Sequence, residues 1–331
     1  MSTIKDVAMR AGVSVGTASK VLSNHASVKA SLRQRVETAV RELAYKPNLA
    51  ARALRTNKID IIGLVVPDIT NPFFAQLAKD VEMAAARWGI SVMLANSLGN
   101  AEMEELRIGA ILDRAPRGII IVASSDSAHI KTRANVPMIA LDRPFGDFPH
   151  VSTDHEKSAA LAADHLYELG HRRICYIAGP RDTNVARDRE KGFTARIKYL
   201  STAKDPVELT VQEGAFDYAS GETIARRLLS MDIDKRPTAI AAASDQQAIG
   251  VVRAARDMGV RIPDDLSVIG YDDINLASLI VPRLSTIRQP INELAMTAVK
   301  LILSIDVDDG SEEFVGSLIH RSSTDRPSIR S

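Results

Sequence analysis

Residues 3–22 decide the fold of the N-terminal segment, and they read TIKDVAMRAGVSVGTASKVL. Thr3 can cap a first helix, and an acidic residue three positions later completes a capping box. Gly12 supplies a turn, and Ser14 is a good N-cap for a second helix over Val15–Leu22. Two short helices joined by a tight turn that contains glycine predict a helix-turn-helix unit.

A third helix is expected to open at Ser31, with Gln34 three residues later and Val28 upstream as a hydrophobic staple. The apolar residues of these three helices recur at helical spacing, so they can close a small core. They are Ile4, Val7, Ala8, Ala11, Ala18, Val21, Leu22, Leu32, Val36, Ala39, Val40 and Leu43. The segment therefore predicts an all-α domain over residues 1–46.

The charge of the chain is spread unevenly. The 331 residues contain 42 Lys or Arg and 41 Asp or Glu, and this net charge of +1 argues against a polyanionic partner. Residues 1–58 nevertheless contain eleven basic and three acidic residues, a net charge of +8, while the remainder carries −7. A basic head on a mildly acidic body is typical of a protein that binds nucleic acid. The alternatives are a basic tail and a three-helix domain that binds protein, and the charge favours DNA.

The second helix of a helix-turn-helix unit enters the major groove, where its early residues meet base edges. Val15 can touch a thymine methyl group, and Lys20 can donate to guanine. Gly16 permits a close approach of the backbone. Thr17 and Ser19 are expected at phosphates, where contacts position the protein without specifying sequence.

A short basic segment follows the predicted head. Lys46-Pro47-Asn48 breaks the third helix, and Asn48 can cap a fourth over Leu49–Arg55. Seven residues are too few for a helix that is stable alone in water, so we expect it to form only when something holds it. Leu54 beside Arg52 suits a wedge into a minor-groove step. The alternative is a plain interdomain linker.

The remainder of the chain alternates short β-rich apolar runs with helical stretches. This alternation predicts βαβ units with parallel sheets, and about 270 residues of it predict two doubly wound lobes. The runs include Ile61–Val66, Ser91–Ala95, Gly118–Ala123, Met138–Leu141, Arg173–Ala178, Thr238–Ala243 and Ser267–Gly270.

Ligands of such sheets bind beyond the carboxyl ends of the strands. Asn71 and Pro72 form an N-cap and N1 pair there, and Phe73 and Phe74 follow on the first turn. These two rings could stack on a ligand or pack in the core. Other strand ends carry charged or polar residues, namely Asp142, Arg143, Arg187, Arg189, Ser244, Asp245, Tyr271, Asp272 and Asp273. Converging Asp and Arg suit a hydroxyl-rich ligand, although any single one could be a cap or a surface ion pair.

Several kinds of site and location are excluded by what the sequence lacks. Its one cysteine, Cys175, lies in an apolar run and is expected to be buried, so no disulfide framework or multi-cysteine metal site is predicted. There is no Walker A, no G-x-G-x-x-G after the first predicted strand and no H-E-x-x-H motif, and the histidines show no metal-ligand spacing. We therefore expect no catalytic residues, no metal and no cofactor. No apolar run reaches membrane-helix length and no signal core opens the chain, so a cytoplasmic protein is expected.

These motifs resemble those of the LacI family of bacterial transcription regulators, and the resemblance spans nearly the whole chain. It is carried by a DNA-binding signature, a hinge and a sensor domain. The matching residues are Thr3-Ile4-Lys5-Asp6-Val7-Ala8, Ala11-Gly12-Val13-Ser14, Thr17, Ser19, Val21-Leu22, Tyr45-x-Pro47-Asn48, Ala51-Arg52-x-Leu54, Asn71-Pro72-Phe73-Phe74, Gly179-Pro180, Gly270-Tyr271-Asp272-Asp273 and Thr286-Ile287-Arg288-Gln289.

The resemblance implies a helix-turn-helix head over residues 1–46, a hinge helix or linker over 47–58, and an effector-binding and dimerisation domain over 59–331. This last domain is implied to have two doubly wound parallel-sheet lobes of periplasmic-binding-protein type. The lobes are expected over about 59–156 with 288–317, and about 157–287 with 318–331.

The resemblance also implies a function. It indicates a cytoplasmic homodimer that represses transcription by binding a palindromic operator in double-stranded DNA, under the control of a sugar or sugar derivative. The implied DNA contacts are Thr3, Val15, Gly16, Thr17, Ser19, Lys20, Asn48, Ala51, Arg52, Leu54 and Arg55. The implied effector contacts are Phe73, Phe74, Asp142, Arg143, Asp154, Arg187, Arg189, Phe216, Asp272 and Gln289.

Two other classes of protein stay open. A cytoplasmic sugar-binding protein that does not bind DNA is one, and the basic head argues against it. An α/β sugar-modifying enzyme is the other, and the absence of a nucleophile, metal or phosphate motif argues against it. A sugar acid, a sugar phosphate or a purine stays open as the effector.

Overall fold

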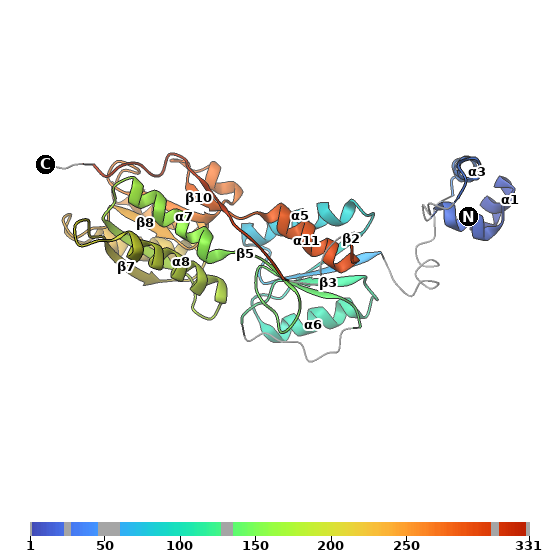
Figure 1. Cartoon of the computed structure of the whole chain (residues 1–331), viewed down its shortest axis with the longest axis horizontal. Helices are drawn as coiled ribbons and strands as arrows, with labels where there is room; N and C mark the ends of the chain where they lie inside the picture. The colour runs from blue at the N-terminus through green and yellow to red at the C-terminus, as the bar shows by residue number, and fades with distance from the viewer. Residues whose placement is uncertain (1, 23–27, 46–59, 127–134, 306–310, 329–331) are drawn as a thin grey trace. The chain divides into compact units, whose positions relative to one another are not determined.

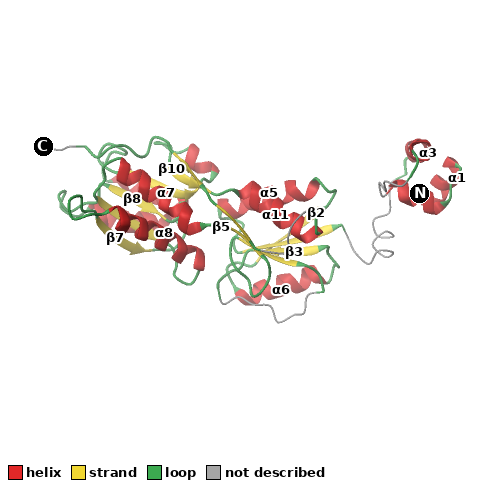
Figure 2. Ribbon diagram, viewed as in Figure 1, coloured by secondary structure: helices red, strands yellow, loops and turns green. Residues whose placement is uncertain are grey.

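The computed structural model describes residues 2–22, 28–45, 60–126, 135–305 and 311–328. The chain forms two compact units, Met1–Ile59 and Asp60–Ser331. The first unit is helical, and the second contains two parallel-sheet lobes (Figure 2). None of the described helices combines the length and the hydropathy that crossing a membrane requires.

The small unit contains helices α1 (Ile4–Ala11), α2 (Val15–Leu22) and α3 (Ala30–Glu42). The predicted capping box is confirmed, because Thr3 Oγ1 accepts from the backbone of Asp6 and the Asp6 carboxylate accepts from the backbone of Thr3. Gly12 ends α1 with φ +62°, in the left-handed region that favours glycine. The bounds of α2 are those predicted from the sequence, and Ser14 Oγ accepts from the backbone N–H of Thr17 at 3.1 Å.

The predicted start of α3 is wrong by one residue. The helix begins at Ala30, and its N-cap is Lys29, which makes no side-chain capping bond. Ser31 therefore lies inside the first turn. The core of this unit consists of Val7, Ala8, Ala11, Ala18, Val21, Val36 and Ala39, all of them buried. The predicted hinge, residues 47–58, lies outside the described residues.

The first lobe is built on a six-stranded sheet with the order β11-β5-β4-β3-β1-β2, in which every pairing is parallel. Helices α5 (Pro72–Ala86) and α11 (Ile291–Leu303) cover one face, and α6 (Ala101–Leu112) covers the other (Figure 1). The strands are β1 (Ile61–Val66), β2 (Ser91–Asn96), β3 (Gly118–Ile121), β4 (Met138–Leu141), β5 (His150–Thr153) and β11 (Glu312–Phe314).

The second lobe repeats this architecture with the order β12-β10-β9-β8-β6-β7, and only the β10–β12 pair is antiparallel. Helices α7 (His155–Glu168) and α8 (Asn184–Leu200) cover one face, and α9 (Tyr218–Leu229) and α10 (Asp245–Asp257) cover the other. The strands are β6 (Arg173–Ala178), β7 (Glu208–Glu213), β8 (Ala239–Ala242), β9 (Ser267–Asp272), β10 (Ser285–Arg288) and β12 (Ser317–Ile319), and a 3-10 turn, η1, spans Asn275–Ser278. Cys175 is fully buried in β6, as predicted.

The chain passes between the lobes three times. It crosses after β5, which is followed at once by α7, between β10 and α11, and between β11 and β12. Each lobe is therefore assembled from separate stretches of sequence. Because the strands are parallel, their carboxyl ends gather at one edge of each sheet, which is where a ligand site is expected.

Candidate functional site

Beyond the strand ends, aromatic and charged side chains from both lobes surround one small space. This space measures about 280 Å³, part of it open to solvent. It is lined by Asn71, Phe73, Phe74, Asp142, Arg143, Val185, Arg189, Phe216, Ser244 and Asp272. Seven of the ten predicted effector contacts therefore come together here.

The first lobe contributes an aromatic corner at the start of α5. The side chain of Asn71 accepts from the backbone of Phe73 at 3.0 Å, and Pro72 occupies the first helical position, as predicted. The rings of Phe73 and Phe74 meet edge to face, with centroids 5.3 Å apart, and each residue is 4% exposed. Both belong to the core of the lobe, which confirms the packing interpretation, and both line the cavity, where stacking on a ligand stays a prediction.

Asp142 and Arg143 follow β4 and add charge to the same wall. Asp142 is buried with φ +66°, a strained backbone conformation of the kind that clusters at functional sites. Burial by itself raises the pKa of Asp142, but the neighbouring His155 imidazole and the cations Arg143 and Arg189 outweigh it and lower that pKa. Asp142 Oδ1 and Arg143 Nε are buried without hydrogen-bond partners among the described protein groups. Asp142 Oδ1 faces His155 Nε2 at 3.5 Å, and Arg143 Nε lies 3.8 Å from Asp142 Oδ2.

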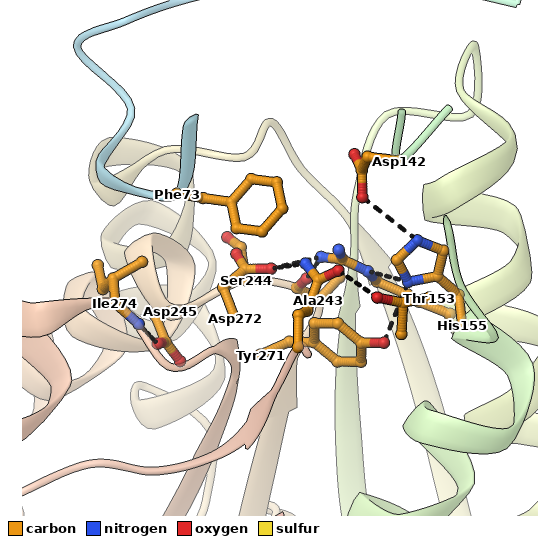
Figure 3. A network of polar contacts seen from close by, with 12 residues as sticks. Phe73, Asp142, Thr153, His155, Ala243, Ser244, Asp245, Tyr271, Asp272 and Ile274 are labelled. Carbon is orange, nitrogen blue, oxygen red and sulfur yellow. Dashed lines mark hydrogen bonds and ion pairs between the residues drawn. The ribbon is translucent and has the colours of Figure 1, made fainter. Parts of the chain in front are cut away.

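The second lobe supplies the complementary pair. Arg189, on α8, places Nη1 3.2 Å from Asp272 Oδ1 at the end of β9, and it also donates to Ala243 O at 2.7 Å. Its guanidinium lies 3.8 Å from the centroid of the Tyr271 ring. Burial raises the pKa of Asp272 to about 6, although Arg189 and Gln289 oppose this rise. Figure 3 shows this network, with Phe73 and Asp142 on the side of the first lobe.

A buried carboxylate behind the cavity fixes the loop that presents Asp272. Asp245 accepts from Ile274 N at 2.8 Å and from Thr286 Oγ1 at 2.6 Å. Gly270 must be glycine, because a Cβ there would lie 2.2 Å from Asp245 Oδ1. The backbone of Asp272 itself has φ +113°, so the strand end is held in a conformation that side-chain residues rarely adopt.

Both parts of the chain match known families. Residues 3–48 match the model of bacterial regulatory proteins, lacI family, and residues 163–324 match that of a periplasmic binding protein-like domain. The chain is 36% identical over 306 residues to the ribose operon repressor of Halalkalibacterium halodurans, a match covering 92% of this chain and 90% of the relative. The chain belongs to the LacI family.

Other LacI-family proteins match over comparable lengths. The HTH-type transcriptional repressor CytR of Escherichia coli is 33% identical, over 98% of this chain and 96% of its own. The crystal structure of the lac repressor dimer bound to operator and the anti-inducer ONPF matches with a TM-score of 0.76 and 28% identity, over 98% of this chain and 99% of its own. The structure of an Enterococcus faecium LacI-family regulator with bound ribose matches with a TM-score of 0.68 and 28% identity, over 80% of this chain and 99% of its own.

As a LacI-family repressor, the chain reads DNA with its head and is not an enzyme. Val15, Gly16 and Lys20 are exposed on α2, with Val15 43% exposed. Thr17 and Ser19 are half-buried, and Thr17 Oγ1 lies 2.9 Å from Ser14 Oγ. Thr3, also exposed, caps α1. The other predicted DNA contacts lie outside the described residues, and they are Asn48, Ala51, Arg52, Leu54 and Arg55.

The structure places three predicted effector contacts outside the lining of the cavity. Asp154 caps α7 and pairs with Lys157 at 2.7 Å. Arg187 points to the other lobe, where its Nη2 lies 2.5 Å from Asp126 Oδ2. Gln289 is buried behind Asp272, to which it donates at 2.8 Å while accepting from Thr153 Oγ1 at 2.7 Å.

Several residues of the site are absent from the predicted effector contacts. Asn71, Val185 and Ser244 line the cavity, and His155 and Tyr271 lie beneath Arg189. Asn71, Ser244 and Tyr271 were named at predicted strand ends, although the predicted effector contacts did not include them. No sequence signal marks His155, because its neighbours in the site come from β4, α8 and β9.

Proposed function

We propose that this LacI-family regulator binds a palindromic operator as a homodimer and that a small sugar, held between its two lobes, controls its affinity for that operator. The observation that carries the proposal is the pairing of Asp142 with Arg143 and of Arg189 with Asp272 around one cavity with three phenylalanine rings.

These side chains match the chemistry of an uncharged sugar. Each hydroxyl both donates and accepts, and carboxylates beside guanidinium groups satisfy both roles with charge-assisted bonds. Phe73, Phe74 and Phe216 offer apolar surface to the C–H faces of a sugar ring. Two carboxylates and two guanidinium groups balance in charge, so an anionic ligand would leave an excess negative charge in a buried site.

Two relatives support a pentose as the first candidate. The Halalkalibacterium halodurans relative is a ribose operon repressor, and the Enterococcus faecium regulator was crystallised with ribose bound.

A homodimer is supported by large apolar side chains on the surface of the first lobe. Met83, Leu94, Leu98 and Leu106 are between 44% and 66% exposed, and they lie on the edge strand β2 or on the segments next to it in the sequence. Exposed apolar surface of this kind marks association sites. The matching lac repressor structure is a dimer on operator, and a second copy of this chain is the partner that we propose.

Control by the sugar would work through the geometry of the two lobes. Binding between them stabilises one relative arrangement of the lobes, and this arrangement sets the spacing of the segments that lead to the two heads of the dimer. Such coupling between sites typically amounts to about 1–3 kcal/mol, or roughly 5- to 150-fold in operator affinity. The protein would act in the cytoplasm, where bacterial operators are found.

The test is a fluorescence anisotropy titration of the full-length protein on DNA from upstream of its own gene, with and without each sugar of a panel that contains D-ribose. A sugar is expected to change operator affinity in the wild type and to leave an Arg189→Met variant unresponsive but still able to bind operator. Random DNA of the same length is the control. The proposal fails if operator affinity is the same with every sugar. If the protein binds a sugar but no DNA, the result favours the alternative of a sugar-binding protein that does not bind DNA.

A further inference from the structure

His155 occupies the boundary between the lobes, and the proposed function does not use it. It is the first residue of α7, directly after the chain leaves β5 of the first lobe. Its side chain is almost completely buried, at 3% exposure, and does not line the ligand cavity. Figure 3 shows it between Asp142 of the first lobe and Tyr271 of the second.

One nitrogen of His155 is an acceptor within the second lobe. Nδ1 lies 3.3 Å from Arg189 Nε and 3.0 Å from the Tyr271 hydroxyl. Arginine can only donate, so Nδ1 must carry the lone pair and the ring proton must lie on Nε2. Burial and the nearby Arg189 charge lower the pKa of His155 to about 4, so the imidazole is neutral at pH 7.

The other nitrogen faces the first lobe across a gap. Nε2 lies 3.5 Å from Asp142 Oδ1, which is too long for an ordinary N–H···O bond. Both atoms are buried, and neither has a hydrogen-bond partner among the described groups. Leaving a buried donor and a buried carboxylate oxygen without a hydrogen bond costs free energy. The folded protein is therefore stabilised by any movement that brings these two atoms together.

We propose that His155 is a positioning residue of the effector site, which orients Arg189 and closes a hydrogen bond to Asp142 in the arrangement of the lobes that the bound sugar stabilises. A shortening of about 0.6 Å would give the ordinary N–H···O length. Because this bond exists only in the liganded arrangement, it contributes to sugar affinity without any contact between His155 and the sugar. The inference rests on the proposed function, since it requires a sugar between the lobes.

The experiment uses the full-length protein and D-ribose, with other pentoses and hexoses as further probes, and measures affinity by calorimetry. His155→Phe keeps a ring of similar shape but removes both nitrogens, so it is expected to weaken binding about tenfold or more, the size of a lost charge-assisted bond. His320→Phe is the matched control, because His320 is an exposed histidine of the same lobe. The control is expected to bind sugar as the wild type does.

A second measurement separates positioning from a structural role. If His155 acts through Asp142, the effects of His155→Phe and Asp142→Asn on affinity are less than additive. In ¹⁵N spectra, the Nε2–H signal of His155 is expected to move downfield when sugar is added to the wild type and to stay in place in Asp142→Asn. Melting temperatures identify any variant that fails to fold.

The outcomes distinguish the two proposals. Additive effects, an unmoved Nε2–H signal in sugar-bound wild type, or wild-type sugar affinity in a folded His155→Phe variant would overturn the role of His155 alone. Wild-type protein that binds none of the sugars would overturn the proposed function, and the role of His155 with it.

Discussion

Arg189 and Asp272 form a buried ion pair, with Nη1 3.2 Å from Oδ1 and both residues less than a tenth exposed. The pair lies within one lobe, but it faces Asp142 of the other across the cavity. Burying two charges is expensive unless further hydrogen bonds support them. Here Gln289 donates to Asp272, and Ala243 O accepts from Arg189.

Replacing Arg189 with Met should therefore damage both stability and sensing. The Asp272 carboxylate would stay buried without its cation, and breaking such a pair costs about 3 kcal/mol or more of the free energy of unfolding. Chemical denaturation at pH 7 measures this loss. An Arg189→Met protein of wild-type stability would contradict the ion pair seen here.

Sugar affinity should fall at acid pH. The pKa of Asp272 is about 6, above its ordinary value of 3.8, so the carboxylate takes up a proton as the pH falls through 6. A protonated carboxyl loses its charge-assisted bonds, and affinity is expected to decrease up to about tenfold per pH unit below that point. Calorimetry between pH 5 and 8 tests this. A flat profile would show that Asp272 does not titrate in this range.

Protein stability should also decrease in acid, through buried histidines. Burial is the chief reason that the pKa of His171 is lowered from its ordinary 6.5 to about 4. Burial also lowers the pKa of His165 to about 4. Between these values the unfolded chain binds protons that the folded chain does not, so stability is full above pH 6.5 and is lost as the pH falls towards 4. Each could remove up to about 3 kcal/mol.

A histidine variant isolates this effect from Asp272, whose raised pKa has the opposite sign and favours the folded state as the pH falls. His171→Gln is expected to lose less stability than the wild type between pH 7 and pH 4.5, measured by denaturant titration. Lys198→Gln, at an exposed position of the same lobe, should follow the wild-type curve. Equal slopes for all three proteins would contradict the assignment to His171.

Arg187 should affect sugar binding only weakly and indirectly. It pairs with Asp126 of the other lobe, and Asp126 Oδ1 also accepts from Asn184 N at the start of α8 at 2.8 Å. The Arg187 and Asp126 side chains are 48% and 32% exposed, so water screens the pair, and Asp126→Ala is expected to lower sugar affinity about two- to fivefold. Calorimetry on Asp126→Ala and Arg187→Met tests this. A much larger loss for Arg187→Met alone would return Arg187 to the list of direct contacts.

Leu54 is expected to matter for specific rather than general DNA binding. Its sequence context predicts a wedge into a central operator step, which a non-specific complex lacks. Leu54→Ala should weaken operator binding more than binding to random DNA, as measured by anisotropy at fixed salt. An equal loss on both DNAs would contradict the wedge.

Local signals in the sequence predicted most of the fold. The capping box at Thr3, the turn at Gly12 and the bounds of α2 depend on neighbours a few residues apart, and the structure confirms them. Five of the seven apolar runs named from the sequence are strands within one residue of the predicted bounds at each end, and the other two, β3 and β9, differ by two residues at one end. Strand β7 was not predicted, because ELTVQE is polar and half-exposed at the sheet edge.

The site was predicted less completely because it depends on how distant segments pack. Position at a strand end was enough for Asp142 and Asp272 to be identified, since parallel strands all end at one edge, whereas Arg189 reaches the cavity from α8. It did not separate the cavity lining from the layer behind it, where Gln289 lies, nor from the lobe boundary, where Arg187 lies.

Because the chain crosses between the lobes three times, the sensor cannot be divided into two separate lobes by cutting the chain at one place. Neither lobe is one continuous stretch, so no single cut after residue 60 yields a complete lobe. Removing the last strands would strip β11 from one sheet and β12 from the other. The head, in contrast, is a contiguous segment with its own core. Recombination can therefore join this sensor whole to a different DNA-reading head, so that the same signal comes to govern other genes.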